Sequence, residues 1–265
     1  ADRIYIGDNP AGHLVEAAKA AFAFAGPATG VTVKGLVIEK YAAPIQWGAI
    51  GHNTPVTGWT IEANEVRLNY GVGILAGSGT RVAGNDVHDN GEMGLGGSGR
   101  GILVEGNSIH ANGFFSGIDP LWEGGGTKFA LTDGLVVRNN TSFGNNGYGL
   151  WTDIDNVNTL YEGNTLTGNL YGGINHEISH AAVIRNNSFA GNGAAQPQWL
   201  WGAAIQIQNS NDVEVYGNTV DMTGAGNGIT LIQQDRGSGP YGRYATTGNY
   251  VHDNVIVSRD IDRGV

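Results

Sequence analysis

Asparagine recurs in pairs along this chain, and the two members of each pair lie five positions apart. The first members are Asn64, Asn85, Asn107, Asn140, Asn164 and Asn187, and the second members are Asn69, Asn90, Asn112, Asn145, Asn169 and Asn192. A seventh unit begins at Asn218 but has Thr223 in the second place, and Asn254 marks an eighth. Where nothing is inserted, units begin 21 to 24 residues apart (85 − 64 = 21, 164 − 140 = 24). A period of this length is typical of repeat folds, in which each unit stacks on the next.

Each unit contains short runs rich in β-branched residues and leaves no room for a helix. The runs "GWTIEAN" (58–64), "LVVRNN" (135–140), "AVIRNN" (182–187) and "DVEVYGN" (212–218) each end on the first Asn of a unit. Glycine follows the Asn pair and often opens a further run of the form Gly-x-aliphatic. Short strands that alternate with Asn and Gly turns at this period predict a parallel β-solenoid. We therefore expect an all-β parallel β-helix of about nine or ten coils, formed by residues 1–265 as a single domain.

The Asn and Gly residues are assigned to the scaffold. Asn tolerates the left-handed conformation of a turn, and its side-chain amide can bond to the Asn of the next coil in a ladder. Glycine accounts for 45 of 265 residues and supplies turns with positive φ. The N-terminal end of such a solenoid should be capped, because an open strand edge invites pairing with another chain. The segment "GHLVEAAKAAFAFAG" (12–26) is either a capping helix or the first strands.

Composition argues against several classes of function. The chain has 14 Lys and Arg against 24 Asp and Glu, a net charge of −10, and no basic run, which argues against nucleic acid and anionic membrane surfaces as partners. No apolar run approaches the length that crosses a bilayer. The absence of Cys excludes disulfides, thiolate nucleophiles and thiolate metal sites.

From about Val31 to Asp260 the repeat resembles the right-handed parallel β-helix superfamily, which includes pectate lyases, polygalacturonases and alginate epimerases. The resemblance implies a groove along one strand face that holds a polysaccharide or oligosaccharide. It also implies a secreted or extracellular protein. The repeat that carries the resemblance is specific for the fold and says much less about the activity.

Placing the Gly-x-aliphatic runs in register predicts which side chains face outward. The inward residues should be Ile74, Leu95, Leu150, Ile174, Ile205 and Ile229. Because side chains alternate along a strand, the residues one and three positions later point outward. One outward column then contains Leu75, Gly96, Trp151, Asn175, Gln206 and Thr230, and the other contains Gly77, Ser98, Asp153, Glu177, Gln208 and Ile232. Asp153 and Glu177 should therefore be neighbours, whereas His176 should point inward or into a turn.

Two insertions flank these columns. Counting back from Asn140 aligns Thr127 and Lys128 with Thr152 and Asp153, so Lys128 would extend the charged column. Glu123 would lie on the loop at its edge. The apolar faces of sugar rings stack on aromatic side chains, and nearby amides can bind sugar hydroxyls. The predicted substrate-binding residues are Trp122, Trp151, Asn175, Trp199, Trp201, Gln206 and Gln208.

The expected spacing of Asp153 and Glu177 predicts a chemistry. Two carboxylates about 5 Å apart repel each other's ionisation, which raises one pKa and leaves one group as acid and the other as nucleophile. That spacing fits a retaining glycosidase. The runs "GLWTD" (149–153) and "INHEIS" (174–179) are also similar to parallel-β-helix β-xylosidases, and this resemblance implies Asp153 as nucleophile and Glu177 as acid/base. We predict a glycoside hydrolase whose candidate catalytic residues are Asp153, Glu177, Lys128, Glu123 and His176.

Two other functions remain open. A polysaccharide lyase or uronate C5-epimerase would need a base and cations facing the uronate carboxylate, for which Lys128, His176 and Arg236 are candidates. A non-catalytic binding or structural solenoid would normally present a flat and regular face, which the mixed outward columns do not resemble.

The site residues also have structural interpretations. Asp153, Asp155 and Asn156 could form a turn or a calcium site, although we expect no required cofactor. Glu177 could be a solvated carboxylate, and His176 is better explained as a structural histidine than as a catalytic one. The Trp residues of the insertions could simply cover them hydrophobically.

Overall fold

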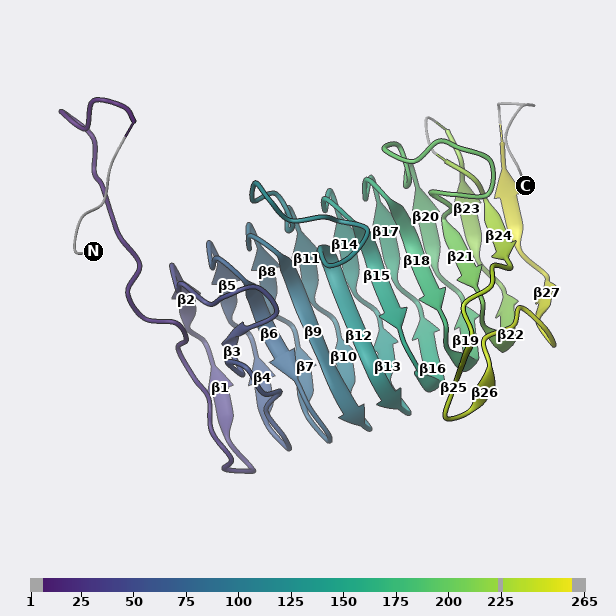
Figure 1. Ribbon diagram of the computed structural model, residues 1–265, viewed down its shortest axis with the longest axis horizontal. Helices are drawn as coiled ribbons and strands as arrows, with labels where there is room; N and C mark the ends of the chain where they lie inside the picture. Colours follow the sequence, from purple (N-terminus) through teal and green to yellow (C-terminus); the bar gives the residue numbers. More distant parts are fainter. Residues whose placement is uncertain (1–6, 224–225, 259–265) are drawn as a thin grey trace.

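The computed structural model describes residues 7–223 and 226–258, and these residues wind into a parallel β-helix (Figure 1). Each complete coil contributes one strand to each of three faces, which we call the first, second and third faces. Strands of one face pair in parallel from each coil to the next. The third face has nine strands in the described part of the chain, so the nine or ten coils predicted from the repeat are confirmed.

The strands are short, and their bounds repeat from coil to coil. The first face consists of β3 (Gly48–Ile50), β6 (Val72–Ala76), β9 (Met93–Arg100), β12 (Gly125–Asp133), β15 (Tyr148–Asp153), β18 (Gly172–Glu177), β21 (Ile205–Gln208) and β24 (Ile229–Ile232). The second face consists of β1 (Thr32–Lys34), β4 (Thr60–Glu62), β7 (Arg81–Ala83), β10 (Leu103–Glu105), β13 (Val136–Arg138), β16 (Val157–Glu162), β19 (His180–Arg185), β22 (Asn211–Tyr216) and β27 (Tyr250–His252). The third face consists of β2 (Val37–Glu39), β5 (Glu65–Arg67), β8 (Asp86–His88), β11 (Ser108–His110), β14 (Thr141–Phe143), β17 (Thr165–Thr167), β20 (Ser188–Ala190), β23 (Thr219–Asp221) and β28 (Val255–Val257). A separate antiparallel hairpin is formed by β25 (Ser238–Gly239) and β26 (Gly242–Arg243).

The predicted Asn ladders run along most of the solenoid. In the first ladder the side-chain amide of each Asn donates to Oδ1 of the next, from Asn64 to Asn254. The second ladder runs in the same way from Asn69 to Asn192. At Asn140, the backbone N–H and Nδ2 both donate to Asn164 Oδ1 at 3.0 Å, and Nδ2 also donates to the Val104 carbonyl at 3.0 Å. Each amide therefore ties its own coil to both neighbours.

The left-handed turn positions differ from the expectation. The residue before each first-ladder Asn has the positive φ, and the ladder Asn itself does not. Glycine fills this position at Gly84, Gly106, Gly163 and Gly217, and another Asn fills it at Asn139 and Asn186. The ladder Asn needs its side chain directed along the solenoid axis, so the preceding residue makes the turn.

The interior is filled by the inward residues that the register predicts. Ile74, Leu95, Leu150, Ile174 and Ile205 are all buried in one apolar cluster, and Ile229 packs against it partly buried. Their strand partners follow one another coil by coil, as in the pairing of Leu150 with Ile174 and of Ile174 with Ile205. The core therefore extends along the axis as stacked aliphatic side chains.

The N-terminal segment 12–26 does not form the capping helix. Backbone bonds join Ala23 to Ala49 and Gly51 to Phe24, and Phe24 forms a parallel bridge with Ile50. These bonds hold Phe24 extended beside β3, so the interpretation as a first strand is correct at that point. Within the described residues β1 and β2 each pair with a strand on one side only. None of the described segments is a helix long and apolar enough to span a membrane.

Two insertions rise at one edge of the first face (Figure 1). Residues 111–124 lie between β11 and β12, and residues 191–204 lie between β20 and β21. The chain between β24 and β27 carries the β25–β26 hairpin, which lies towards the opposite edge (Figure 1). Side chains from all three segments line a hollow on the first face, which we call the groove.

We predict that Asn140→Ala lowers the free energy of unfolding by about 3 kcal/mol. The change removes the acceptor for the Asn107 backbone N–H and the donor to the Val104 carbonyl, and each buried unpaired group costs about 1–3 kcal/mol. Urea unfolding followed by circular dichroism measures the effect. The exposed Asn53→Ala is the control and should change the free energy by less than about 0.5 kcal/mol. Equal stability of the two variants would contradict a supporting role for the ladder.

Candidate active site

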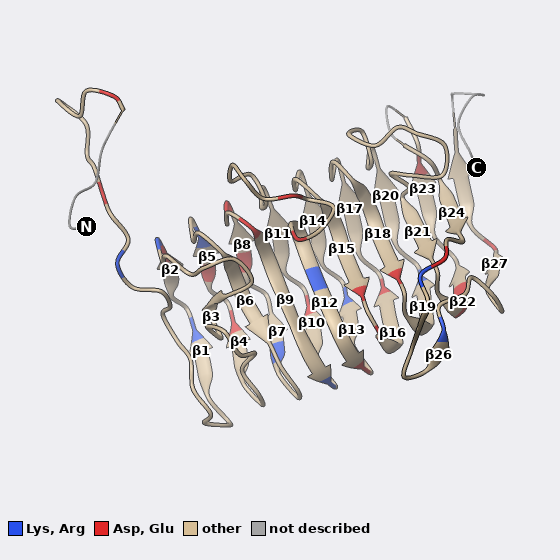
Figure 2. Cartoon of the chain, in the orientation of Figure 1, with Lys and Arg blue, Asp and Glu red and all other residues tan. Residues whose placement is uncertain are grey.

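Asp153 and Glu177 lie directly opposite each other on β15 and β18, as the register predicts. Adjacent strands are about 4.8 Å apart, so the two side chains start from neighbouring positions on the same face. The column continues through Gln208 to Ile232. The exposed fractions of Asp153 and Glu177 are only 7% and 8%, although both face outward. Figure 2 shows acidic segments at the ends of β15 and β18 beside a basic segment on β12.

Lys128 belongs to a different column from the predicted one. Phe129 pairs with Thr152, which places Lys128 beside Trp151, and the alignment of Lys128 with Asp153 is therefore wrong. The reason is that β12 is long and has an irregularity between Phe129 and Thr132, which absorbs residues that the count from Asn140 could not locate. The side chain still reaches across, and Nζ lies 3.0 Å from Asp153 Oδ2.

Lys128 links two carboxylates. Its Nζ is also 3.0 Å from Glu123 Oε2, donates to the Trp122 carbonyl at 2.6 Å and lies 4.2 Å from the centroid of the Trp151 ring. Burial lowers the pKa of Lys128, but the charges of Asp153 and Glu123 outweigh this effect and hold the pKa above its usual value. Burial raises the pKa of Glu123, although Lys128 opposes the increase. Lys128 is therefore a fixed cation beside Asp153.

Glu177 is in a different electrostatic environment. Burial raises its pKa, the charge of Asp153 raises it further, and the hydrogen bond from Arg236 lowers it, leaving the pKa above its usual value. Arg236 Nη1 lies 2.6 Å from Oε1, and Asn175 Nδ2 donates to Oε2 at 3.3 Å. The pair is thus asymmetric: Lys128 contacts Asp153, whereas burial and the charge of Asp153 raise the pKa of Glu177.

The two oxygens of Asp153 have different surroundings. Oδ2 is fixed by Lys128, whereas Oδ1 is buried and has no hydrogen-bond partner among the described residues. The indole Nε1 of Trp151 is likewise buried without a partner in this part of the chain. Buried polar atoms normally have partners, so these two atoms are unsatisfied, and a ligand would reach them only if the side chains that cover them move.

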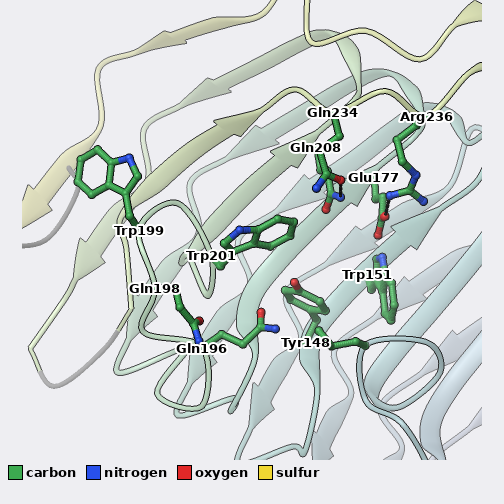
Figure 3. A pocket seen from close by; sticks show the side chains of 11 residues that line it. Tyr148, Trp151, Glu177, Gln196, Gln198, Trp199, Trp201, Gln208, Gln234 and Arg236 are labelled. Atoms are coloured by element: carbon green, nitrogen blue, oxygen red, sulfur yellow. Dashed lines mark hydrogen bonds and ion pairs between the residues drawn. The ribbon is translucent and has the colours of Figure 1, made fainter.

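Two hollows flank the carboxylate pair. The larger, about 720 Å³, is lined by Glu177 and Arg236 together with aromatic and Gln side chains (Figure 3). The smaller, about 450 Å³, is lined by Asp153, Lys128, Glu123 and Trp122 together with small residues of β9. The pair therefore lies between two spaces, with one carboxyl facing each.

The predicted Trp residues border these hollows. Trp199 and Trp201 line the larger one, where Trp199 is 66% exposed, and Trp122 lines the smaller one and is 55% exposed. Trp151 is buried on the floor, and Figure 3 shows it beside Glu177. The insertions thus do bring the three loop Trp residues to the groove.

An amide network forms the floor of the larger hollow. Gln206 Nε2 donates to Tyr148 Oη at 3.2 Å and to Asn175 Oδ1 at 3.3 Å, and Gln208 donates to Gln234 at 3.0 Å. Of the three predicted amide residues only Gln208 lines the hollow, because Asn175 and Gln206 are buried beneath it. The repeat does not predict the lining residues Leu121, Tyr148, Gln196, Gln198 and Gln234. Tyr148 follows a Gly at the start of its strand, and the others lie in insertions, where the repeat gives no register.

His176 is wrong as a catalytic candidate. It is fully buried and points inward, where Nδ1 lies 2.7 Å from Thr152 Oγ1. Burial lowers its pKa to about 3. The inward direction follows from its place between Asn175 and Glu177, as the sequence predicts.

Glu92 carries a buried carboxyl group that the repeat pattern does not predict. Oε2 accepts the Gln46 backbone N–H at 2.7 Å, and Oε1 has no partner among the described residues. Burial raises the pKa of Glu92 to about 8, and the charge of Glu123 contributes to the increase. With a pKa of about 8, Glu92 is mainly protonated at neutral pH.

The possible calcium ligands point in different directions. Asp153 faces the groove, Asp155 accepts the Tyr244 hydroxyl at 2.9 Å, and Asn156 accepts from Thr132 in a further ladder between coils. The ladder explains Asn156 without an ion.

We predict that Arg236→Gln raises the pKa of Glu177 further, because the change removes a hydrogen bond and a positive charge that lower it. The measurement is a titration of the Glu side-chain carboxyl carbons by NMR, with Glu177→Gln assigning the signal. Arg185→Gln is the matched control, since Arg185 pairs with Glu162 on the second face. A fall in the Glu177 pKa, or no change, would contradict the described contact.

Comparison with known proteins agrees with this architecture. A family model described as "Right handed beta helix region" matches residues 49–220, while no curated protein matches the sequence significantly. Among solved structures, XylC with xylose aligns with a TM-score of 0.54 at 14% identity, covering 87% of this chain and 53% of that chain. A DFA-IIIase variant from Arthrobacter chlorophenolicus A6 aligns with a TM-score of 0.55 at 16% identity, covering 89% of this chain and 57% of that chain. This chain thus spans little more than half the length of either structure, and at these identities the likeness concerns the fold. The chain belongs to the right-handed β-helix family.

Proposed function

We propose that this chain is a carbohydrate-active enzyme, a glycoside hydrolase that retains anomeric configuration. The observation that carries the proposal is the placement of Asp153 and Glu177 side by side on adjacent strands, between two hollows, in unequal electrostatic environments. Retaining glycosidases need two carboxyl groups about 5–5.5 Å apart, one ionised and one protonated. Strand spacing and the asymmetry of the pair support that arrangement.

In the proposed first step, Asp153 Oδ1 attacks the anomeric carbon and the glycosidic bond breaks. Lys128 holds Oδ2, so Oδ1, which has no partner among the described residues and must first become accessible, is the proposed attacking oxygen. Glu177 gives its proton to the departing glycosidic oxygen, and Arg236 stabilises the carboxylate that results. In the second step, Glu177 takes a proton from water, the water oxygen bonds to the anomeric carbon, and Asp153 leaves.

The two hollows suggest how the substrate is held. A sugar bonded to Asp153 lies on the side of the smaller hollow, and the leaving group beside Glu177 lies in the larger hollow, among Tyr148, Trp201 and the amides. XylC, which shares the fold, was solved with xylose, so pentosides belong in the first substrate panel beside hexosides.

A lyase or epimerase receives less support from the geometry. Such an enzyme needs cations that are free to meet a uronate carboxylate. Lys128 contacts Asp153 and Glu123, and Arg236 contacts Glu177, so both candidate cations already face carboxylates. His176 is enclosed in the interior and cannot act as the base.

We predict that Asp153→Asn lowers kcat roughly 10⁴-fold or more, since the nucleophile is lost while shape is kept. Glu177→Gln should lower kcat about 10²–10⁴-fold on natural glycosides and much less on aryl glycosides whose leaving group needs no proton. The assay measures reducing sugar from a panel of neutral and uronic glycans. Absorbance of unsaturated products is recorded in parallel, because a lyase produces them and a hydrolase does not.

Glu162→Gln, which changes a carboxyl on the second face, is the matched control and should retain wild-type activity. Full activity of Asp153→Asn on a confirmed substrate would place the site elsewhere. Unsaturated products from the wild-type protein would replace the hydrolase with the lyase alternative.

A further inference from the structure

A second cluster of polar side chains lies on the third face, on a different sheet from the groove. Asp86 and His88 are on β8, and His110 is paired with His88 from β11. One ligand atom from each of these three residues lies within 4.8 Å of the other two. Among the residues that the structure describes, no other His, Asp and Glu group meets this condition.

The contacts of His88 match those of a metal-binding histidine. Nδ1 lies 2.7 Å from Asp89 Oδ2, while Nε2 lies 3.3 Å from Glu65 Oε1. Histidines that bind metals usually donate one ring N–H to a carboxylate, which fixes the tautomer and directs the other nitrogen's lone pair at the ion. With Nδ1–H donated to Asp89, Nε2 is the nitrogen left beside Glu65, where it either carries a proton that Glu65 accepts or binds a cation that both atoms contact.

His110 supplies a second nitrogen in the same place. Its Nε2 lies 3.0 Å from Asp86 Oδ1. The two imidazole rings are stacked with centroids 4.8 Å apart and planes within 3°, and Phe143 stacks on the other side of His110. Both rings are therefore held with their Nε2 atoms on the carboxylate side.

The surrounding charge also favours a cation. Glu65, Asp86 and Asp89 bring three carboxylates to the two histidines, and Arg67 pairs with Glu65 at 2.6 Å. One arginine leaves two of these negative charges uncompensated. Two imidazole nitrogens with a carboxylate oxygen form the donor set that suits Zn²⁺ and similar transition metals better than Ca²⁺ or Mg²⁺.

We propose that His88 Nε2, His110 Nε2 and the Asp86 carboxylate form a site for Zn²⁺ or a similar divalent transition metal, with water as a fourth ligand. Bonds of about 2.0–2.2 Å to one ion require the two rings to rotate out of their parallel stack. Because the ligands come from two consecutive coils, the ion clamps β8 to β11 and stabilises the folded solenoid by binding it in preference to the unfolded chain. The site is structural and independent of the groove.

The test is calorimetric titration of Zn²⁺ into protein without a polyhistidine tag, after treatment with a chelator. One equivalent should bind, and the thermal unfolding midpoint should rise with Zn²⁺. His88→Gln and His110→Gln should each weaken binding at least about tenfold. Asp89→Asn, which removes the negative charge beside Nδ1, should weaken it roughly 10–100-fold while leaving all three ligands in place.

His252→Gln is the matched control. Its Nε2 is 3.3 Å from Glu214 and its Nδ1 is 2.9 Å from Asp253, but its ring neighbours are Tyr216 and Tyr250 instead of a second histidine. Zn²⁺ binding should be the same as in the wild-type protein. Circular dichroism verifies that each variant folds. If His88→Gln or His110→Gln does not fold, Asp89→Asn tests the site in its place. Absence of Zn²⁺ binding, or equal binding by the folded His88, His110 and His252 variants, would overturn the site.

Discussion

The side-chain amide of asparagine, bonded to its equivalent in the next coil, is the interaction on which this structure depends. A solenoid coil has few contacts of its own with distant parts of the chain, so its position is fixed by its two neighbours. Along the first ladder each amide donates to the next Asn and to a backbone carbonyl of the preceding coil, in a buried environment where unpaired groups are costly. The ladders therefore fix the vertical alignment of coils, and the stacked aliphatic residues supply the burial.

Alignment at the turns sets the alignment of the strand faces. Because Asn169 lies over Asn145 in the second ladder, the strands that follow them, β15 and β18, also lie in register, and side chains with the same phase form columns across the sheet. This is how Asp153 and Glu177, 24 residues apart in sequence, come to adjacent strands (177 − 153 = 24). Around this pair, the segment between β24 and β27 brings Arg236 to Glu177, and Lys128 reaches Asp153 from β12.

The repeat makes the regular part of the molecule predictable from the sequence. It does not make the irregular part predictable. The inward aliphatic residues, both outward columns around Asp153 and the inward direction of His176 follow from period and alternation. Counting back from Asn140 puts Lys128 two residues out of register, because the irregularity in β12 leaves no trace in the spacing of Asn residues. The sequence suggests Arg236 only as a possible cation. Its contact with Glu177 joins residues 59 positions apart through an insertion, which the repeat cannot predict.

The repeat does not predict the burial of Glu92 either, because the segments around Gln46 and Glu123 that contact it lie outside the repeat pattern. The sequence leaves the N-terminal segment ambiguous between helix and strand. Its backbone hydrogen bonds to the coil that contains β3 show that it is extended there.

The most direct test of the central claim is to identify the carboxylate that bonds covalently to the sugar. A 2-deoxy-2-fluoro glycoside of the sugar found in the substrate screen, with an activated leaving group, should trap the intermediate, and mass spectrometry of peptides locates the label. Our account predicts one label on the peptide that contains Asp153, at the residue itself. A label on Glu177, Glu123 or any other side chain, or a product of inverted configuration with no label, would contradict it.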